Sequence, residues 1–158
     1  MTDSRGLTSR TPRTVLGCYH RAMLDKSADD LADLYAVDAL HEFPFSAPGF
    51  PARFTGREEV RAGYRAAWGA SPLQVVEIAD VAVRPAADPG TVVAEHVVVV
   101  RSAEGDGFAV PGLLIIEVRD GLITRKRVPR WIARAGAPDC ASGAPMTSEC
   151  YPGQVSQG

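Results

Sequence analysis

The sequence predicts an α+β domain in which helices come first and an antiparallel sheet follows. Before residue 70, apolar residues recur at three- and four-residue spacing, whereas after residue 72 apolar runs alternate with turn clusters. Since helices and strands do not alternate along the chain, the strands are expected to pair antiparallel rather than through βαβ crossovers. A single domain of 158 residues can bury a sufficient core without a disulfide or a metal.

The first two helices are predicted from their N-terminal residues. Pro12 suits the first turn of a helix because its missing N–H has no partner there. The helix that follows has an apolar face of Val15, Cys18, Tyr19, Ala22 and Met23. Ser27 is a good N-cap for a second, short helix, and Asp29 and Asp30 lie in its first turn, where the helix dipole is positive. The apolar face of this helix is Leu31, Leu34 and Tyr35.

A short strand and a third helix are expected next. Residues Ala39–Phe45 (ALHEFPF) are strand-like and lead into a Pro/Gly-rich loop at Ser46–Arg53. Thr55 and Glu58 match the capping-box pattern S/T-x-x-E, which predicts a helix that ends near Trp68. Its apolar face holds Val60, Tyr64, Ala67 and Trp68.

The remaining chain predicts four strands in a meander. Turn clusters at Pro85–Gly90, Glu104–Gly107 and Arg119–Gly121 separate them, and Asp-Gly in the last cluster is a strong hairpin signal. The predicted strands are Leu73–Arg84, Thr91–Arg101, Phe108–Val118 and Leu122–Trp131. Because Val92–Val100 is nearly continuous in valine, both of its faces are expected to be covered. The helices would cover one face, and a second copy of the sheet in a homodimer would cover the other.

The two ends of the chain are expected to lie outside the folded domain. Residues 1–11 are polar, and residues 135–158 are rich in Gly, Pro, Ser and Ala. We therefore expect a disordered lead-in, a domain at 12–134 and a poorly ordered tail. The three cysteines are an odd, sparse set, which fits a reducing cytoplasm rather than a disulfide framework, and a Cys140–Cys150 bridge would staple only the tail.

Charge and hydropathy exclude two classes of partner. The net charge of −2 comes from 17 basic and 19 acidic residues that are interspersed, so the net basic face needed for non-specific nucleic-acid binding is lacking. No apolar run approaches the roughly 18–20 residues that span a bilayer, and Met1–Arg13 carries no apolar signal-peptide region. We therefore expect a cytoplasmic protein that binds neither nucleic acid nor membrane.

Three segments give the sequence a family resemblance: Tyr19–Pro44 (YHRAMLDKSADDLADLYAVDALHEFP), Thr55–Glu58 (TGRE) and Val118–Ile123 (VRDGLI). Over residues 12–132 the chain resembles the nuclear transport factor 2-like superfamily, specifically the SnoaL-like polyketide cyclases and the ketosteroid isomerases. The resemblance implies a cone-shaped, cystatin-like fold with three N-terminal helices packed on a strongly curved antiparallel sheet. That fold hosts isomerases, cyclases, epoxide hydrolases, dehydratases and non-catalytic binders.

The resemblance also implies which positions correspond to the catalytic residues of the family. Tyr19 falls at the oxyanion-stabilising tyrosine of the isomerases, but Phe43 occupies the place of their general-base aspartate, and their second acid maps near Leu114. In SnoaL-like cyclases and related epoxide hydrolases an acid follows an arginine in the last strand. Here Arg127 takes the arginine position and Val128 the acid position. The chain keeps a hydrogen-bond donor and an arginine but lacks the family's proton-transfer carboxylates.

His41 is the first candidate for a catalytic base. Strand alternation places His41 and Phe43 on one face, which the resemblance directs into the pocket. Glu42 lies on the other face, where it is solvated or at a subunit contact. An imidazole can take a proton α to a carbonyl while Tyr19 donates to the forming enolate. The alternatives are a histidine hydrogen-bonded at a sheet edge and a core-edge tyrosine with a wet hydroxyl.

Three charged or titratable strand residues have structural alternatives to a catalytic role. Glu95 and His96 must face opposite ways, so one of them enters the helix-covered side. A buried member would need a partner there, such as Arg125 or Arg127. Glu117 has the same ambiguity. An ion pair is the structural alternative to a pocket acid or base.

No metal or cofactor is expected. His20, His41 and His96 lack ligand spacing, and His20 is expected at the surface. No Gly-rich phosphate motif occurs, and Cys18 has no flanking feature that would activate it as a nucleophile. The basic run at 125–127, with Arg130, is divided between two faces by alternation, which is typical of a solvated or interfacial stripe rather than a phosphate cradle.

An apolar small molecule is the expected ligand. Residues Pro44–Phe54 (PFSAPGFPARF) are too apolar for a purely solvated loop, which predicts a lid or pocket wall. The predicted pocket residues are Phe43, Phe45, Phe50, Phe54, Tyr64, Trp68, His96, Leu114 and Val128. The alternative is that the aromatic rings complete the core.

By resemblance, the sequence predicts a cofactor-independent SnoaL-like enzyme of secondary metabolism, such as antibiotic biosynthesis. It would cyclise or isomerise a polyketide-type carbonyl compound by proton transfer, with Tyr19 as oxyanion donor, His41 as base and Arg127 as an electrostatic or orienting group. The alternative is a non-catalytic ligand-binding or accessory protein, which the absence of the family's acids favours. An epoxide hydrolase or dehydratase would need two carboxylates on the pocket face, and it is excluded if Glu95 and Glu117 both face outward.

Overall fold

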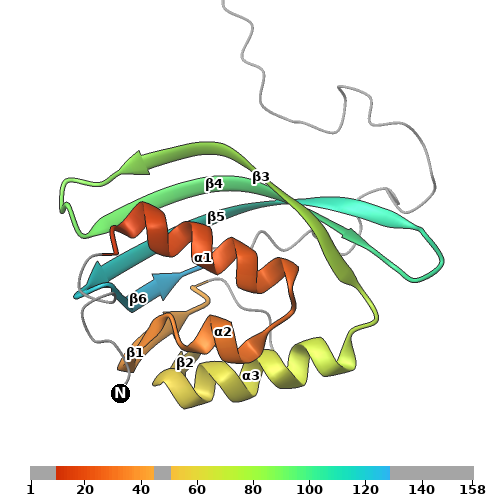
Figure 1. Cartoon of the computed structure of the whole chain (residues 1–158), viewed down its shortest axis with the longest axis horizontal. Helices are drawn as coiled ribbons and strands as arrows, with labels where there is room; N and C mark the ends of the chain where they lie inside the picture. Colours follow the sequence, from red (N-terminus) through yellow and green to blue (C-terminus); the bar gives the residue numbers. More distant parts are fainter. Residues whose placement is uncertain (1–9, 45–50, 129–158) are drawn as a thin grey trace, which may run out of the picture.

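The computed structural model describes residues 10–44 and 51–128, and three helices lie on one side of a curved sheet (Figure 1). The helices are α1 (Pro12–Leu24), α2 (Ala28–Ala32) and α3 (Arg57–Ala70). The strands are β1 (Tyr35–Glu42), β2 (Arg53–Thr55), β3 (Gln74–Pro85), β4 (Thr91–Arg101), β5 (Gly107–Arg119) and β6 (Leu122–Arg127). Residues 1–9 of the predicted disordered lead-in (1–11) and the predicted tail lie outside the described residues, as do Phe45, Phe50, Arg130, Cys140 and Cys150.

Within the described residues, six strands form one sheet in the order β2-β1-β6-β5-β4-β3. Neighbouring strands are antiparallel except β1 and β6, which are parallel. The predicted α+β class and curved, antiparallel sheet are confirmed, and the parallel pairing of β1 with β6 is a departure within that sheet. The reason is that β1 leaves the helical half of the chain and pairs with the last strand of the meander. The hairpin of β4 and β5 extends beyond the helices (Figure 1).

Side-chain caps begin the first two helices as the sequence predicts. Thr11 Oγ1 accepts from the N–H of Thr14 (3.2 Å), with Pro12 in the first turn of α1. Ser27 Oγ accepts from the N–H of Asp30 (3.2 Å) at the start of α2. Each cap satisfies a donor that has no partner inside its helix.

The third helix begins without a side-chain cap. Its N-cap is Gly56 at φ +87°, a conformation that glycine adopts without strain. Glu59, rather than Glu58, reaches back and accepts from the N–H of Thr55 (2.7 Å). The predicted capping box is therefore wrong, because the N–H of Gly56 is tied to Ala39 O (2.7 Å) and the helix begins one residue later.

The first two strands differ most from the prediction. β1 begins at Tyr35, because the N–H of Ile123 donates to Leu34 O (2.8 Å) and Tyr35 pairs with Ile123 in register. Tyr35 is therefore a strand residue and not part of the second helix. β2 begins at the last residue of the predicted loop, Arg53, and pairs antiparallel with β1, with Phe54 opposite His41. A three-residue strand has no periodicity to detect, so only its pairing reveals it.

The long strands agree with the sequence. β4 has the predicted bounds, and β5 and β6 meet at a hairpin in which Asp120 (φ 51°) and Gly121 (φ 75°) both have positive φ, as a type I′ turn requires. Alternation along β4 directs the buried Val92, Ala94 and His96 toward the helices. Glu95 therefore points to the opposite face. This confirms that one of the pair Glu95 and His96 enters the helix-covered side.

The helices of the described segments are too short or too polar to cross a bilayer.

Candidate active site

The parallel strands β1 and β6 place their side chains in pairs. Leu40 is in register with Arg125, His41 with Lys126, and Glu42 with Arg127. Because side chains alternate along a strand, His41 and Lys126 share the helix-covered face, and both are fully buried. Two titratable side chains therefore lie next to each other inside the molecule.

Lys126 contacts Tyr19 of α1. Its Nζ donates a hydrogen bond to Tyr19 Oη and lies 3.7 Å from the centre of the Tyr19 ring. Among the described residues, no carboxylate forms an ion pair with Lys126. Burial lowers the pKa of Lys126 well below its ordinary value and raises the pKa of Tyr19. Both effects favour an uncharged amine beside an uncharged phenol.

Two more tyrosine hydroxyl groups and His41 lie next to the pair of Lys126 and Tyr19. Tyr19 Oη lies 3.4 Å from Tyr64 Oη of α3, and the Tyr64 ring is 5.6 Å from the His41 ring. Tyr35 Oη lies 3.0 Å from His41 Nδ1, and burial raises the pKa of Tyr35. We call Tyr19, Tyr35, His41, Tyr64 and Lys126 the buried polar cluster. It joins groups from α1, α3, β1 and β6 that can donate or accept protons.

Aromatic rings surround His41. The ring of Phe43 lies 4.6 Å away and that of Phe54 lies 5.8 Å away, while Tyr35 stacks on the imidazole at 5.9 Å. Trp68 packs edge-on against Tyr64 at 5.0 Å. Three of the predicted pocket aromatics, Phe43, Phe54 and Trp68, thus lie around the buried polar cluster, and a fourth, Tyr64, belongs to it. They provide an apolar environment in which hydrogen bonds are stronger than in water.

A second group of titratable residues lies between α1 and the strands β3 and β4. The rings of His20 and His96 are perpendicular with centres 5.5 Å apart, and His20 Nδ1 lies 3.7 Å from Asp80 Oδ1. The prediction that His20 lies at the surface is wrong, because its side chain is only 12% exposed against the sheet. We call His20, Asp80 and His96 the histidine cluster.

Burial is the main cause of the lowered pKa values in the histidine cluster. Burial, together with the nearby His20 and Lys126, lowers the pKa of His96 to about 4, while Asp80 opposes the shift. The pKa of His20 is lowered by burial and by Lys126, again against Asp80. Both histidines are therefore neutral at pH 7. In the described part of the chain, His20 Nε2 and His96 Nδ1 are buried without a hydrogen-bond partner.

Comparison with known proteins assigns the chain to a family. The family model for the SnoaL-like domain matches residues 17–126. The chain belongs to the SnoaL-like family. Among curated proteins, no sequence matches it.

Solved structures confirm the nuclear transport factor 2-like, ketosteroid isomerase-like fold of this SnoaL-like chain. A candidate isomerase from Bacillus subtilis is 26% identical with a TM-score of 0.67, over 75% of this chain and 84% of that one. A Mycobacterium tuberculosis protein in complex with estradiol-17β-hemisuccinate is 20% identical with a TM-score of 0.61, over 75% and 93%. A candidate polyketide cyclase from Pseudomonas putida is 18% identical with a TM-score of 0.62, over 78% and 94%.

In this SnoaL-like domain, Arg127 does not face the buried polar cluster. It lies on the opposite face of β6, where Arg127 Nε and Arg125 Nε donate to Glu42 Oε2 at 3.2 and 2.7 Å. These two arginines lower the pKa of Glu42, Arg125 most. The predicted role of Arg127 in the pocket therefore has no support in its position, because alternation separates it from His41 and Tyr19.

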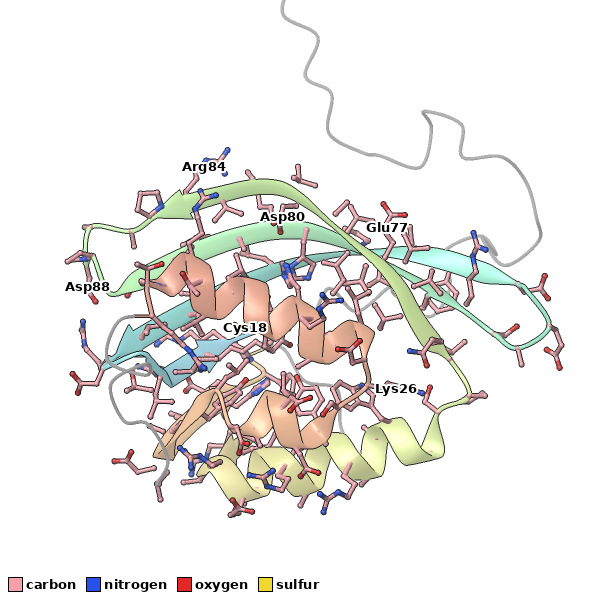
Figure 2. All side chains as sticks on the ribbon, viewed as in Figure 1. Cys18, Lys26, Glu77, Asp80, Arg84 and Asp88 are labelled. Carbon is pink, nitrogen blue, oxygen red and sulfur yellow. The ribbon has the colours of Figure 1, made fainter. Side chains whose placement is uncertain are left out.

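The outward acids have local partners. Glu95 Oε1 accepts from Arg84 Nη1 at 2.6 Å, and Arg84 points away from the helices (Figure 2). The predicted partners Arg125 and Arg127 bind Glu42 instead. Glu117 alternates with the buried Ile116 and Val118, so it also points away from the helices.

The remaining predicted pocket positions lie against the core. Leu114 is buried on the helix-covered face of β5, opposite Ala94 of β4. Val128 is half-buried, packs against the core, and donates its N–H to Glu42 O (3.0 Å). His96 lies nearer the middle of β4, opposite Gly112.

Lys126 is the functional candidate that sequence reasoning missed. Its neighbours Arg125 and Arg127 suggested a basic stripe, and the stripe is real on the outer face. Alternation requires Lys126 to point the other way, toward the helices, and this was the available signal. Nothing in the sequence showed that Tyr19, 107 residues away, would receive its hydrogen bond.

A small residue opposite His96 makes room for its ring. A Cβ atom built at Gly112 would lie 2.6 Å from His96 Nε2. We expect Gly112→Ala to lower the free energy of unfolding by about 1–3 kcal/mol, because the imidazole must leave its position in a packed site. In a His96→Ala background the same change should cost far less. Urea unfolding of the unmodified protein, the two single variants and the double variant measures the loss of unfolding free energy caused by Gly112→Ala. An equal loss with and without His96 would contradict the contact.

Lys126 is expected to destabilise the fold at neutral pH. Its amine is charged and hydrated in the unfolded chain but buried in the folded one, so Lys126→Met should raise the free energy of unfolding at pH 7 by about 1–3 kcal/mol. Tyr19 Oη would keep Tyr64 Oη as a partner. The unfolded lysine loses its proton near its ordinary pKa of 10.5. The rise in unfolding free energy caused by Lys126→Met should therefore become smaller as the pH approaches that value. Chemical denaturation of Lys126→Met and the unmodified protein at pH 7 and 10 measures this difference. A Lys126→Met protein that is less stable than the unmodified one at pH 7 would show that the amine is charged and paired.

Three or more His, Cys, Asp or Glu side chains do not converge in metal-binding geometry anywhere in the described residues.

Proposed function

We propose that this SnoaL-like chain is an enzyme that isomerises or cyclises a polyketide-type carbonyl compound by proton transfer, without a cofactor. The observation that supports this most strongly is the buried polar cluster. It brings an imidazole, an amine and phenols together on the helix-covered face, and no carboxylate of the described residues forms an ion pair with the amine. Such groups can move protons near neutral pH.

In this proposal His41 removes the proton α to the carbonyl. In the tautomer whose Nδ1–H donates to Tyr35 Oη, the Nε2 atom carries the lone pair that accepts the substrate proton. The aromatic rings of Phe43 and Phe54 hold the imidazole in place. His41 then returns the proton at another carbon, or after ring closure, as isomerisation or cyclisation requires.

Tyr19 is the proposed donor to the carbonyl oxygen. Its hydroxyl accepts from Lys126 Nζ, so its own O–H can be directed at an oxygen that becomes negative as the α-proton leaves. A phenol whose pKa is raised by burial stays protonated and can donate throughout the reaction. Arg127 would act only through the structure, because it binds Glu42 and thereby joins β6 to β1.

The proposed substrate is small and largely apolar, as expected of secondary metabolism. On the concave side beyond α1, β4 and β5 continue with the apolar residues Val98, Val100, Phe108 and Val110, and Phe108 is 54% exposed. A structural neighbour binds a steroid derivative, and a ligand of that size and polarity would suit this surface. Polar recognition would come from the buried polar cluster.

A non-catalytic ligand-binding protein is the second candidate. The observation that favours it is the apolar Phe43 and Val128 at the two positions where the resemblance expects carboxylates. An epoxide hydrolase or dehydratase is not proposed, because Glu95 and Glu117 both point away from the helices.

We also propose a cytoplasmic homodimer, with residues 12–134 as its domain. The face of β4 and β5 opposite the helices carries Val93, Val97, Val99, Leu113 and Ile115, which a second sheet would cover. Sedimentation equilibrium should give twice the chain mass. A monomer at micromolar concentration would contradict the dimer.

Conversion of a panel of polyketide-like ketones, followed by liquid chromatography and mass spectrometry, tests the enzyme proposal. We expect at least one ketone to be isomerised or cyclised faster than in buffer, and Glu95→Gln, which alters an outward residue, to convert it equally well. Ketones that bind, as titration calorimetry detects, but are never converted would support the binding-protein alternative.

A further inference from the structure

Lys126 has surroundings that suit a reactive amine. It is fully buried, and within residues 10–44 and 51–128 its Nζ bonds to Tyr19 Oη rather than to a carboxylate that would hold it as an ammonium ion. An amine in such surroundings keeps its lone pair and becomes a nucleophile toward carbonyl carbon. The direction of its pKa, lowered by burial, agrees with this geometry.

We propose that Lys126 forms an imine with the carbonyl group of the substrate, which is therefore a ketone or 1,3-dicarbonyl compound. This inference rests on the proposed function, because it assumes that a carbonyl compound binds at the buried polar cluster. It adds a covalent step in which the enzyme activates the substrate.

The groups needed for that step lie around Nζ. The nitrogen lone pair attacks the carbonyl carbon, a C–N bond forms, and the oxygen becomes the hydroxyl of a carbinolamine. Loss of that hydroxyl as water breaks the C–O bond and requires a proton. Tyr19 Oη, hydrogen-bonded to Nζ, is placed to donate it and then to recover a proton from nitrogen.

His41 is placed to use the imine. It is the register partner of Lys126 across the β1–β6 pair, and neighbouring strands lie about 4.8 Å apart. Removal of the α-proton by His41, together with return of a proton from Tyr19 Oη to nitrogen, converts the imine to an enamine, whose carbon can be reprotonated elsewhere or can attack a second carbonyl. Hydrolysis by one water then returns the amine and the ketone oxygen, so the cycle needs no oxidant or reductant.

The chain contains its own control. It has two lysines, Lys26 and Lys126. Lys26 lies at the turn after α1, is half-buried, and donates from Nζ to Ser71 O at 2.9 Å (Figure 2). Lys26 does not belong to the buried polar cluster, so a reaction specific to Lys126 is readily separated from general lysine chemistry.

A 1,3-diketone is the probe, because its imine rearranges to a stable enaminone without a reductant. Acetylacetone and an aryl-substituted 1,3-diketone are incubated with the full chain at pH 7. Intact mass and peptide mapping then locate the adduct, whose mass is that of the probe minus one water. We expect one adduct per chain on Lys126, retained in Lys26→Arg and lost in Lys126→Met. Tyr19→Phe should slow its formation at least tenfold.

The proposal would be overturned if the unmodified protein formed no adduct, or formed it only on Lys26 or the N-terminal amine. Mapping the unmodified protein decides this even if Lys126→Met fails to fold. The outcome is separate from that of the proposed function. If α-proton exchange of a bound ketone persists in folded Lys126→Met, proton transfer stands and the imine is wrong, whereas absence of exchange in every form would remove the proton-transfer function itself.

Discussion

Replacing His41 by glutamine is expected to lower the rate of α-proton transfer by about 10²–10⁴-fold, the usual contribution of a positioned acid or base. Glutamine can still bond to Tyr35 Oη, which lies 3.0 Å from His41 Nδ1, and it occupies a similar volume among the aromatic rings. It cannot accept a proton at neutral pH. The loss should therefore appear in kcat, with little change in the Kd of the ketone.

The matched control for His41→Gln is Glu95→Gln, a titratable residue that points away from the helices and pairs with Arg84. It should keep the full rate. Thermal unfolding of both variants checks that the fold remains. A folded His41→Gln protein that turns over substrate as fast as the unmodified one would remove His41 from the chemistry and move the role of base to another buried group, such as Lys126 or His96.

Acidification from pH 6.5 to 4 is expected to lower the free energy of unfolding by on the order of 3 kcal/mol through His96 alone. Burial first, then His20 and Lys126, hold the pKa of His96 at about 4 against the attraction of Asp80. Between that pKa and the ordinary value of 6.5, the unfolded chain binds a proton that the folded chain does not. Stability is therefore highest above pH 6.5 and falls as the pH drops toward 4.

His96→Leu should flatten this pH dependence. Leucine does not titrate, so the difference in unfolding free energy between pH 7 and pH 4.5 should be smaller than in the unmodified protein, as denaturant unfolding measures. His20, whose pKa is also lowered, keeps a part of the dependence in both proteins. Glu42 loses its arginine partners only below its ordinary pKa of 4.5, and it does so equally in both proteins. Parallel pH curves for the two would contradict the buried neutral histidine.

The sequence predicts the periodic and locally encoded features of the fold. β4 has the expected bounds because its valine run is bordered by turn residues, and Asp120-Gly121 makes the expected hairpin because both residues tolerate positive φ. Alternation alone placed His41 with Phe43 and opposite Glu42. These features depend on neighbouring residues in the chain.

The features that the sequence did not predict depend on contacts between distant segments. The parallel pairing of β1 with β6 sets Lys126 beside His41, and no local pattern specifies it. His20 was expected at the surface because its side of α1 could not be known to meet β3 and β4, where His96 lies. The single glycine opposite His96 became meaningful only once the register was known.

Hydrogen–deuterium exchange at the carbon α to a ketone is the most direct test of the proposed proton transfer. Polyketide-like ketones are incubated with the protein in D₂O, and the deuterium that they gain is followed by mass spectrometry. We expect a bound ketone to exchange faster than in buffer, and the enhancement to be lost in His41→Gln but kept in Glu95→Gln. Exchange at the buffer rate for every ketone shown to bind would contradict the account and leave a ligand-binding protein.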